Sequence, residues 1–166
     1  MLNKELSHQY IRREISWEEF WERYSKDNVI FEGYLLHLCK KALAEQSADT
    51  IFEAMFIVHY FKDEPTDDTF LDILVACMAG RWHQQHEDLV HYYKGCFREK
   101  DIPVLMELVH FQPEYLEWDE SRQLARKCIY AIEKINAEAA SLAIKELVAS
   151  EDETVRYYAQ KVLDRN

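Results

Sequence analysis

The chain is poor in glycine and proline, with three residues of each among its 166. Folds built from strands joined by tight turns use more of both, so the sequence favours an all-α protein. Its longest apolar run, residues 73–80, is far shorter than the roughly 20 residues that a membrane-spanning helix needs. Residues 1–14 mix polar and charged side chains, unlike a secretory signal peptide. We therefore expect a cytoplasmic, all-helical protein.

Cations are also scarce, because 31 acidic residues face only 20 Lys and Arg, which gives a formal charge of −11. Proteins that bind nucleic acid or anionic membranes need cations to neutralise phosphates. The charge balance therefore argues against both kinds of partner. It leaves a basic protein partner open.

Signatures of catalysis are missing as well. The sequence holds no glycine-rich phosphate loop and no G-x-S-x-G motif. Its four cysteines, Cys39, Cys77, Cys96 and Cys128, form no C-x-x-C pair, and each lies in an apolar stretch of an expected helix. We interpret them as reduced core residues and predict that the protein is not an enzyme and holds no cofactor.

Apolar periodicity predicts a single domain over residues 1–166 with about eight to nine helices. Ser16 and Glu19 have the spacing of a capping box, and an aromatic stripe follows at helical spacing (Trp17, Phe20, Trp21, Tyr24). Further helices are expected over residues 28–46, 51–61, 70–79, 84–97, 101–112, 119–135, 136–149 and 150–163, with Pro113 ending the helix at 101–112. Caps are expected at Asp49, at Asp101, at Asn136 and at a second capping box, Ser150 with Glu153. The helices at 51–61 and 70–79 are apolar almost all round, which predicts a central pair.

The last third of the chain repeats a pattern at a constant offset of 34 residues. The matching pairs are Arg122 with Arg156, Ala125 with Ala159, Cys128 with Val162, and Ile129 with Leu163. Residues 151–156, followed by Ala159 and Leu163, resemble the signature of HEAT-like repeats. The resemblance covers residues 119–165 and implies stacked antiparallel helix pairs, a HEAT/ARM-like α-solenoid. Such folds are mostly binding scaffolds.

The connector before this repeat is the most distinctive loop of the sequence, since residues 110–121 hold aromatic and acidic residues but neither Lys nor Arg. We predict that it binds a partner through Glu114, Tyr115, Glu117, Trp118, Asp119 and Glu120. The alternative is a solvated loop whose Trp118 folds back on the core. A second acidic patch, Asp63, Glu64, Asp67 and Asp68, is a further candidate, with helix capping as its alternative.

Histidines supply the only candidate metal ligands. His83, Glu87 and His91 are spaced to share one helix face, with His86 beside them. Glu107 and His110 have the E-x-x-H spacing of di-iron helices, but the further ligands of such a site are missing. We therefore predict no metal site.

Small size, acidity and a HEAT-like stack together resemble, at the level of the class, immunity proteins of bacterial toxin systems. The resemblance implies a non-catalytic module that neutralises a basic, nuclease-type toxin through an acidic surface. The alternatives are a generic HEAT-like scaffold or adaptor and, with least support, a metal-dependent helical enzyme.

Overall fold

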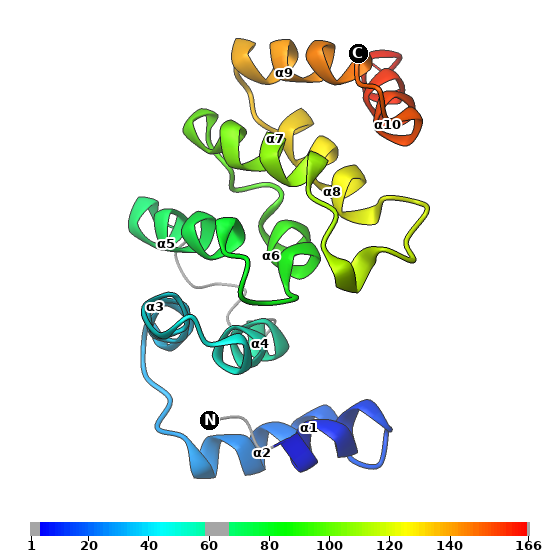
Figure 1. The fold of residues 1–166 in the computed structure, drawn as a ribbon. Helices are drawn as coiled ribbons and strands as arrows, with labels where there is room; N and C mark the ends of the chain where they lie inside the picture. Colours follow the sequence, from blue (N-terminus) through cyan, green and yellow to red (C-terminus); the bar gives the residue numbers. More distant parts are fainter. Residues whose placement is uncertain (1–3, 59–66, 166) are drawn as a thin grey trace. The chain divides into compact units, whose positions relative to one another are not determined.

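The computed structural model describes residues 4–58 and 67–165, and in these residues it is all-helical, without strands (Figure 1). The all-α prediction is confirmed, although the described residues form ten α-helices and not eight to nine. The chain divides into two compact units, residues 1–65 and 66–166, which we describe separately. The assignment of residues 1–166 to one domain stays a prediction.

Unit 1 holds α1 (Lys4–Ile11), α2 (Trp17–Asp27), α3 (Tyr34–Glu45) and α4 (Ala48–Ile57). The aromatic stripe of α2 faces inward, where the Phe20 ring lies 4.8 Å from Trp17 and 5.2 Å from Phe56 of α4, measured between centroids. Phe20 and Tyr24 are buried, while Trp17 and Trp21 are half-buried. The stripe is therefore packing surface, because most of its area is used inside the unit.

A buried polar cluster ties three of these helices together. The Tyr24 hydroxyl donates to the Glu53 carboxylate at 2.7 Å and lies 3.1 Å from the Tyr34 hydroxyl. Glu53 is only 2% exposed. Burial raises the pKa of Tyr24, and the bonds to Tyr34 and Glu53 raise it further, so the phenol stays protonated and can donate.

Backbone geometry shortens two predicted helices. Gly33, with φ 76°, precedes α3, and Arg122, with φ 52°, precedes α8. A left-handed residue cannot continue a right-handed helix, so these helices start at Tyr34 and Gln123 instead of residues 28 and 119. Phe31 consequently lies outside α3 and is 47% exposed.

Helix caps follow the predicted chemistry but not always the predicted residue. Ser16 accepts the Glu19 N–H at 3.1 Å as expected. Ser47 caps α4 in place of Asp49, and Asp152 caps α10 in place of Ser150. Asp152 prevails because one carboxylate oxygen accepts the N–H groups of both Thr154 and Val155. Ala137 precedes α9 without a side-chain cap, so the prediction for Asn136 is wrong.

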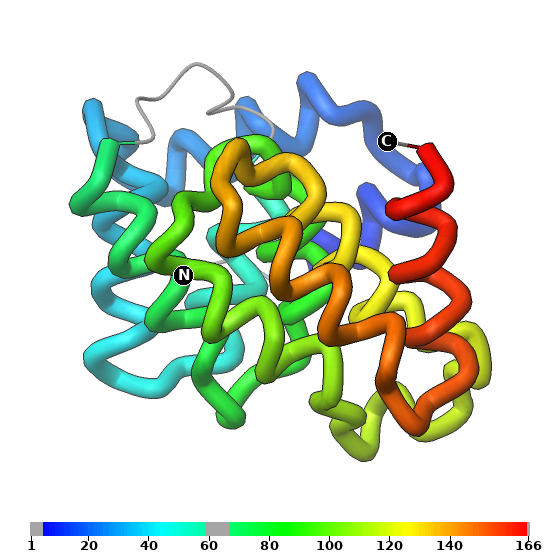
Figure 2. The backbone as a smooth tube through the Cα atoms, turned by 90° about the horizontal axis from the view of Figure 1, so that it is seen from above, coloured from blue at the N-terminus to red at the C-terminus, as the bar shows by residue number. Residues whose placement is uncertain are grey.

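Unit 2 runs through three consecutive helix pairs. The pairs are α5 (Asp68–Ala79) with α6 (His86–Tyr93), α7 (Ile102–His110) with α8 (Gln123–Glu133), and α9 (Glu138–Val148) with α10 (Glu153–Leu163); two short 3-10 turns, η2 (Glu99–Asp101) and η3 (Glu114–Leu116), lie between them. The first helices of neighbouring pairs pack on one another, α5 on α7 and α7 on α9 (Figures 1 and 2). The second helices do the same, α6 on α8 and α8 on α10.

Small and apolar side chains fill the space between these layers. Ala125, Cys128 and Ala159 are almost fully buried, which lets the axes of α8 and α10 approach closely. In α9 the buried small residues are Ala140 and Ala143, whereas Ala139 is half-buried. At the offset of 34 residues, Ala125 and Ala159 are both buried, as are Cys128 and Val162, whereas Ile129 is buried and Leu163 half-buried.

All four cysteines are free thiols, and Cys39, Cys77 and Cys128 are buried, with Cys96 half-buried. Burial raises the pKa of Cys77 to about 12 and raises that of Cys128 as well, so neither thiol is activated. Across residues 4–58 and 67–165, no helix has the length and apolar character to span a bilayer.

Candidate protein-binding site

In the structure α7 ends at His110 and α8 begins at Gln123, so the connector comprises residues 111–122, one residue later at each end than predicted. The name refers to this range from here on. Pro113 follows the end of α7, and the 3-10 turn η3 comes directly after it, closed by the Leu116 N–H to Pro113 carbonyl bond of 2.8 Å. Behind the connector the remaining crevice measures only 10 Å³, about the room of one water molecule. This crevice is therefore too small for any ligand larger than a water molecule.

The buried His86 holds the connector in place through its hydrogen bond with Tyr115. Its Nε2 lies 2.7 Å from the Gly80 carbonyl oxygen and its Nδ1 lies 2.8 Å from the Tyr115 hydroxyl. A carbonyl only accepts, so Nε2 carries the proton and the neutral ring accepts from Tyr115 at Nδ1. Burial lowers the pKa of His86 to about 4, and the charges of His83 and Arg81 act in the same direction. At neutral pH the ring is thus held neutral in one tautomer.

Tyr115 and Phe111 complete this inner side. Burial raises the pKa of Tyr115 to about 12, so its hydroxyl is a reliable donor. The Arg81 guanidinium lies over the Phe111 ring, 3.7 Å from its centroid. Tyr115, predicted as a partner anchor, is therefore half-buried and bonded inward.

Asp119 holds the far end of the connector. Its side chain accepts from the Ser121 hydroxyl at 2.5 Å and from the Gln123 N–H at 2.6 Å, and the residue is 8% exposed. Burial alone would raise the pKa of this carboxyl, but the bonds from Ser121 and Gln123 and the charge of Arg122 outweigh it and lower the pKa. Asp119 thus serves as the cap of α8.

Arg122 joins the connector to both neighbouring helix pairs. Its guanidinium donates to the Val109 carbonyl at the end of α7 at 3.2 Å and to the side chain of Gln112. It also pairs with Asp152, the cap of α10, at 3.3 Å. These bonds compensate for the left-handed backbone of Arg122 and fix the point where α8 begins.

Trp118 projects from this fixed backbone. It is 78% exposed, and its indole Nε1 donates to the Tyr115 carbonyl at 2.9 Å. The alternative in which Trp118 folds back on the core is wrong. Glu114, Glu117 and Glu120 of the same connector are exposed as well. Of the six predicted residues the structure brings four to the surface, Glu114, Glu117, Trp118 and Glu120, and turns Tyr115 and Asp119 inward.

Two residues of the predicted second acidic patch, Asp67 and Asp68, are described by the structure, and both form contacts within unit 2. Asp67 caps α5 by accepting the Phe70 N–H at 2.8 Å, as the alternative of helix capping predicts. Asp68 pairs with Arg98 at 2.7 Å. Asp63 and Glu64 lie outside the described residues.

Arg98 is a residue whose role sequence reasoning missed. Its guanidinium contacts Asp68 and Asp72 of α5 and also Asp101, whose side chain is 4% exposed. The bond to Asp101 raises the pKa of Arg98 most, so the cation is permanent. The acidic residues of α5 were the available signal, because a half-buried arginine needs such partners.

The predicted histidine face does not exist as one face. His83 precedes α6, which begins at His86, so helical spacing does not relate it to Glu87 and His91. Its Nε2 lies 2.8 Å from the Cys77 carbonyl, and its Nδ1 accepts the Gln85 N–H at 3.0 Å. Glu87 pairs with Lys127 and His91 is exposed. No group of three potential metal ligands occurs in the described part of the chain.

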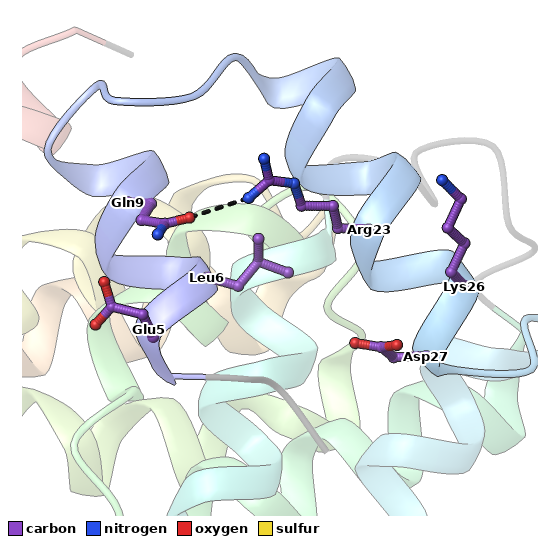
Figure 3. Close-up of a pocket in the computed structure, with 6 residues that line it drawn as sticks. All are labelled: Glu5, Leu6, Gln9, Arg23, Lys26 and Asp27. Carbon is purple, nitrogen blue, oxygen red and sulfur yellow. Dashed lines mark hydrogen bonds between the residues drawn. The ribbon is translucent and has the colours of Figure 1, made fainter.

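Unit 1 carries a surface groove of 340 Å³ between α1 and α2 (Figure 3). Its charged side chains are of both signs, with acidic Glu5 and Asp27 and basic Arg23 and Lys26. Arg23 donates to Gln9 at 3.2 Å and pairs with Glu19. The groove thus has no net charge preference.

No protein-family model matches the chain, and neither a curated protein nor a solved structure matches it.

Proposed function

We propose that the chain is a non-catalytic binding module whose unit 2 is a short HEAT-like α-solenoid. The arrangement of α5 to α10 in three consecutive pairs supports this, as does the 34-residue offset between α8 and α10. In such stacks each pair contacts only its neighbours, and connectors between pairs are free to carry binding residues.

The proposed partner is a basic protein that docks on the connector. The observation that carries this proposal is Trp118, a large aromatic side chain that is 78% exposed and has three exposed glutamates within four residues of it in the connector. Exposed tryptophans are enriched among residues that dominate binding energy, and surrounding carboxylates attract cationic partners. Trp118 can also hold a partner Arg or Lys over its ring.

Rigidity of the connector strengthens the proposal. His86, Asp119 and Arg122 hold the backbone on both sides of Trp118, so binding would order few additional groups. A preorganised loop loses less conformational entropy on association than a mobile one. We extend the proposal to an immunity-type role, in which the partner is a nuclease-type toxin. Its Lys and Arg side chains, which would otherwise bind nucleic-acid phosphates, pair with Glu114, Glu117 and Glu120.

The test is affinity capture from the native host with four forms of the chain: wild type, Trp118→Ala, Glu117→Lys with Glu120→Lys, and the control Glu146→Lys with Glu151→Lys. The control changes two exposed acids of unit 2 outside the connector, with the same change in net charge. We expect a basic protein to co-purify with wild type and control only. Trp118→Ala should weaken its binding by about 2 kcal/mol, roughly thirtyfold.

Reversing the two connector charges should slow association and flatten its dependence on salt. If the captured protein is a nuclease, stoichiometric inhibition of its activity would support the immunity-type role. Equal capture by all four forms would contradict the proposed site.

A further inference from the structure

A second surface of opposite charge lies on α8 and α10. Three tyrosine rings meet there: Tyr130 and Tyr158 at 6.2 Å, and Tyr157 and Tyr158 at 5.3 Å between centroids. A cation accompanies each ring, with Arg126 6.0 Å from Tyr158, Lys161 5.6 Å from Tyr157, and Arg165 5.4 Å from Tyr130. We call these six residues the cation–tyrosine surface.

The three cations of this surface form no ion pair with any carboxylate of the described residues. Arg98, Arg122 and Lys127 all pair with carboxylates. Among the residues that the structure describes, no carboxylate lies within ion-pair distance of Arg126, Lys161 or Arg165. Glu133 and Asp164 stand at the C-terminal edge of the surface, and Asp164 accepts from Gln160 at 2.7 Å. The positive charge is therefore available to an external anion, beside Tyr157, which is 59% exposed.

The cation–tyrosine surface adjoins the connector. The Tyr158 hydroxyl donates to the Ser121 carbonyl at 3.4 Å, and Arg126 stands one turn after Arg122. Figure 2 shows the connector, in yellow-green, beside α10, in red. The connector, with its exposed tryptophan and three exposed glutamates, and the cation–tyrosine surface, with exposed Tyr157, are thus neighbouring parts of unit 2.

We propose that unit 2 binds a second copy of the chain, with the connector of each copy on the cation–tyrosine surface of the other. Adjacent patches of opposite charge are self-complementary about a two-fold axis, because the same contact then forms twice. Glu114, Glu117 and Glu120 face Arg126, Lys161 and Arg165, and Trp118 supplies an aromatic anchor to each half. A net charge of −11 opposes association, but salt at about 0.15 M screens charges separated by more than roughly 8 Å.

This self-association uses the connector that is also proposed to bind a basic partner, so such a partner would compete with the second copy. The two proposals are separable, because self-association is measured on the purified chain alone. Its failure would leave the partner proposal intact.

Sedimentation velocity over a concentration series tests the proposal with two charge-reversed forms. One form carries Glu117→Lys with Glu120→Lys, and the other carries Lys161→Glu with Arg165→Glu; all four side chains are exposed, so circular dichroism should show unchanged helix content. We expect wild type to dimerise and each form alone to dimerise at least about tenfold more weakly. A mixture of the two forms should regain the dimer, because both contacts of the mixed pair again join opposite charges.

The control Glu146→Lys with Glu151→Lys should dimerise like wild type, and raising the salt to about 1 M should weaken the wild-type dimer. A wild-type chain that is monomeric at every concentration would overturn the proposal, as would a mixture that does not regain the dimer. Binding of a polyglutamate peptide by such a monomer would assign the surface to an acidic partner instead.

Discussion

Acid should destabilise unit 2 through His86. The ring is fully buried, its Nε2–H is committed to the Gly80 carbonyl, and its centroid lies 4.3 Å from that of His83. The pKa of His86 is about 4 in the folded chain, against an ordinary value of 6.5. Because the folded pKa is the lower one, the unfolded chain takes up the proton first. Stability from this group is therefore complete above pH 6.5 and is lost as the pH falls toward 4.

The size of this effect follows from the difference between the two pKa values. The free energy of unfolding should fall by about 2 kcal/mol between neutral pH and about pH 5, and by about 3 kcal/mol once the folded ring titrates. Burial lowers the pKa of His83 too, which adds to the loss in the same pH range. Asp119, whose pKa is lowered, acts only below the ordinary carboxyl value of 3.8, outside this range.

Urea unfolding followed by circular dichroism at about pH 7.5 and about pH 5 measures the loss. His86→Leu should be less stable at both values, because Tyr115 and the Gly80 carbonyl lose their partner, but it should lose about 2 kcal/mol less than wild type on acidification. His91→Gln, at an exposed histidine of the same helix, should keep the wild-type dependence. An equal loss in wild type and His86→Leu would refute the reasoning.

Two further predictions concern residues that hold unit 2 together. Arg98→Ala should lower the free energy of unfolding in urea by about 2 kcal/mol, because the buried Asp101 carboxylate loses its charged donor. The control Arg12→Ala, at an exposed ion pair, should leave the urea midpoint unchanged. Equal shifts of the midpoint in the two variants would contradict this account. Gly80→Ala should cost about 1 to 3 kcal/mol, since a Cβ there would lie 2.5 Å from Trp82 Nε1 and 2.9 Å from the Cys77 carbonyl oxygen. Thermal unfolding should show no such loss for Gly95→Ala, where a Cβ meets nothing within 4 Å.

Local patterns in the sequence predicted the elements of the fold well. Ser16 caps α2 and Pro113 follows the end of α7, because both effects depend on neighbouring residues alone. The 34-residue offset correctly paired Ala125 with Ala159 as buried small residues. The sequence did not decide between neighbouring candidates for a helix cap, because Ser, Thr, Asp and Asn differ little in capping ability. The structure has Ser47 in place of the predicted Asp49, and Asp152 in place of the predicted Ser150.

The candidate site was predicted in part. Trp118 and three of its acidic neighbours are exposed, and their role in binding a partner stays a prediction, while Tyr115 and Asp119 are turned inward by His86 and by the N-terminus of α8. Nothing in the spacing of the sequence relates Tyr115 to His86, which stands 29 residues earlier. The cation–tyrosine surface was missed for the same reason, because its residues come from two helices.

The sequence by itself determined the helical class, the interruptions between helices and the excess of acid in the connector. These depend on composition, on periodicity and on contacts between near neighbours. Only the tertiary structure decided which side chains face outward, because burial of His86, Tyr115 and Asp119 depends on helices packed from distant parts of the chain. The same packing left Trp118 exposed and set three cations over the tyrosine rings of α8 and α10, and these two surfaces carry the functional proposals.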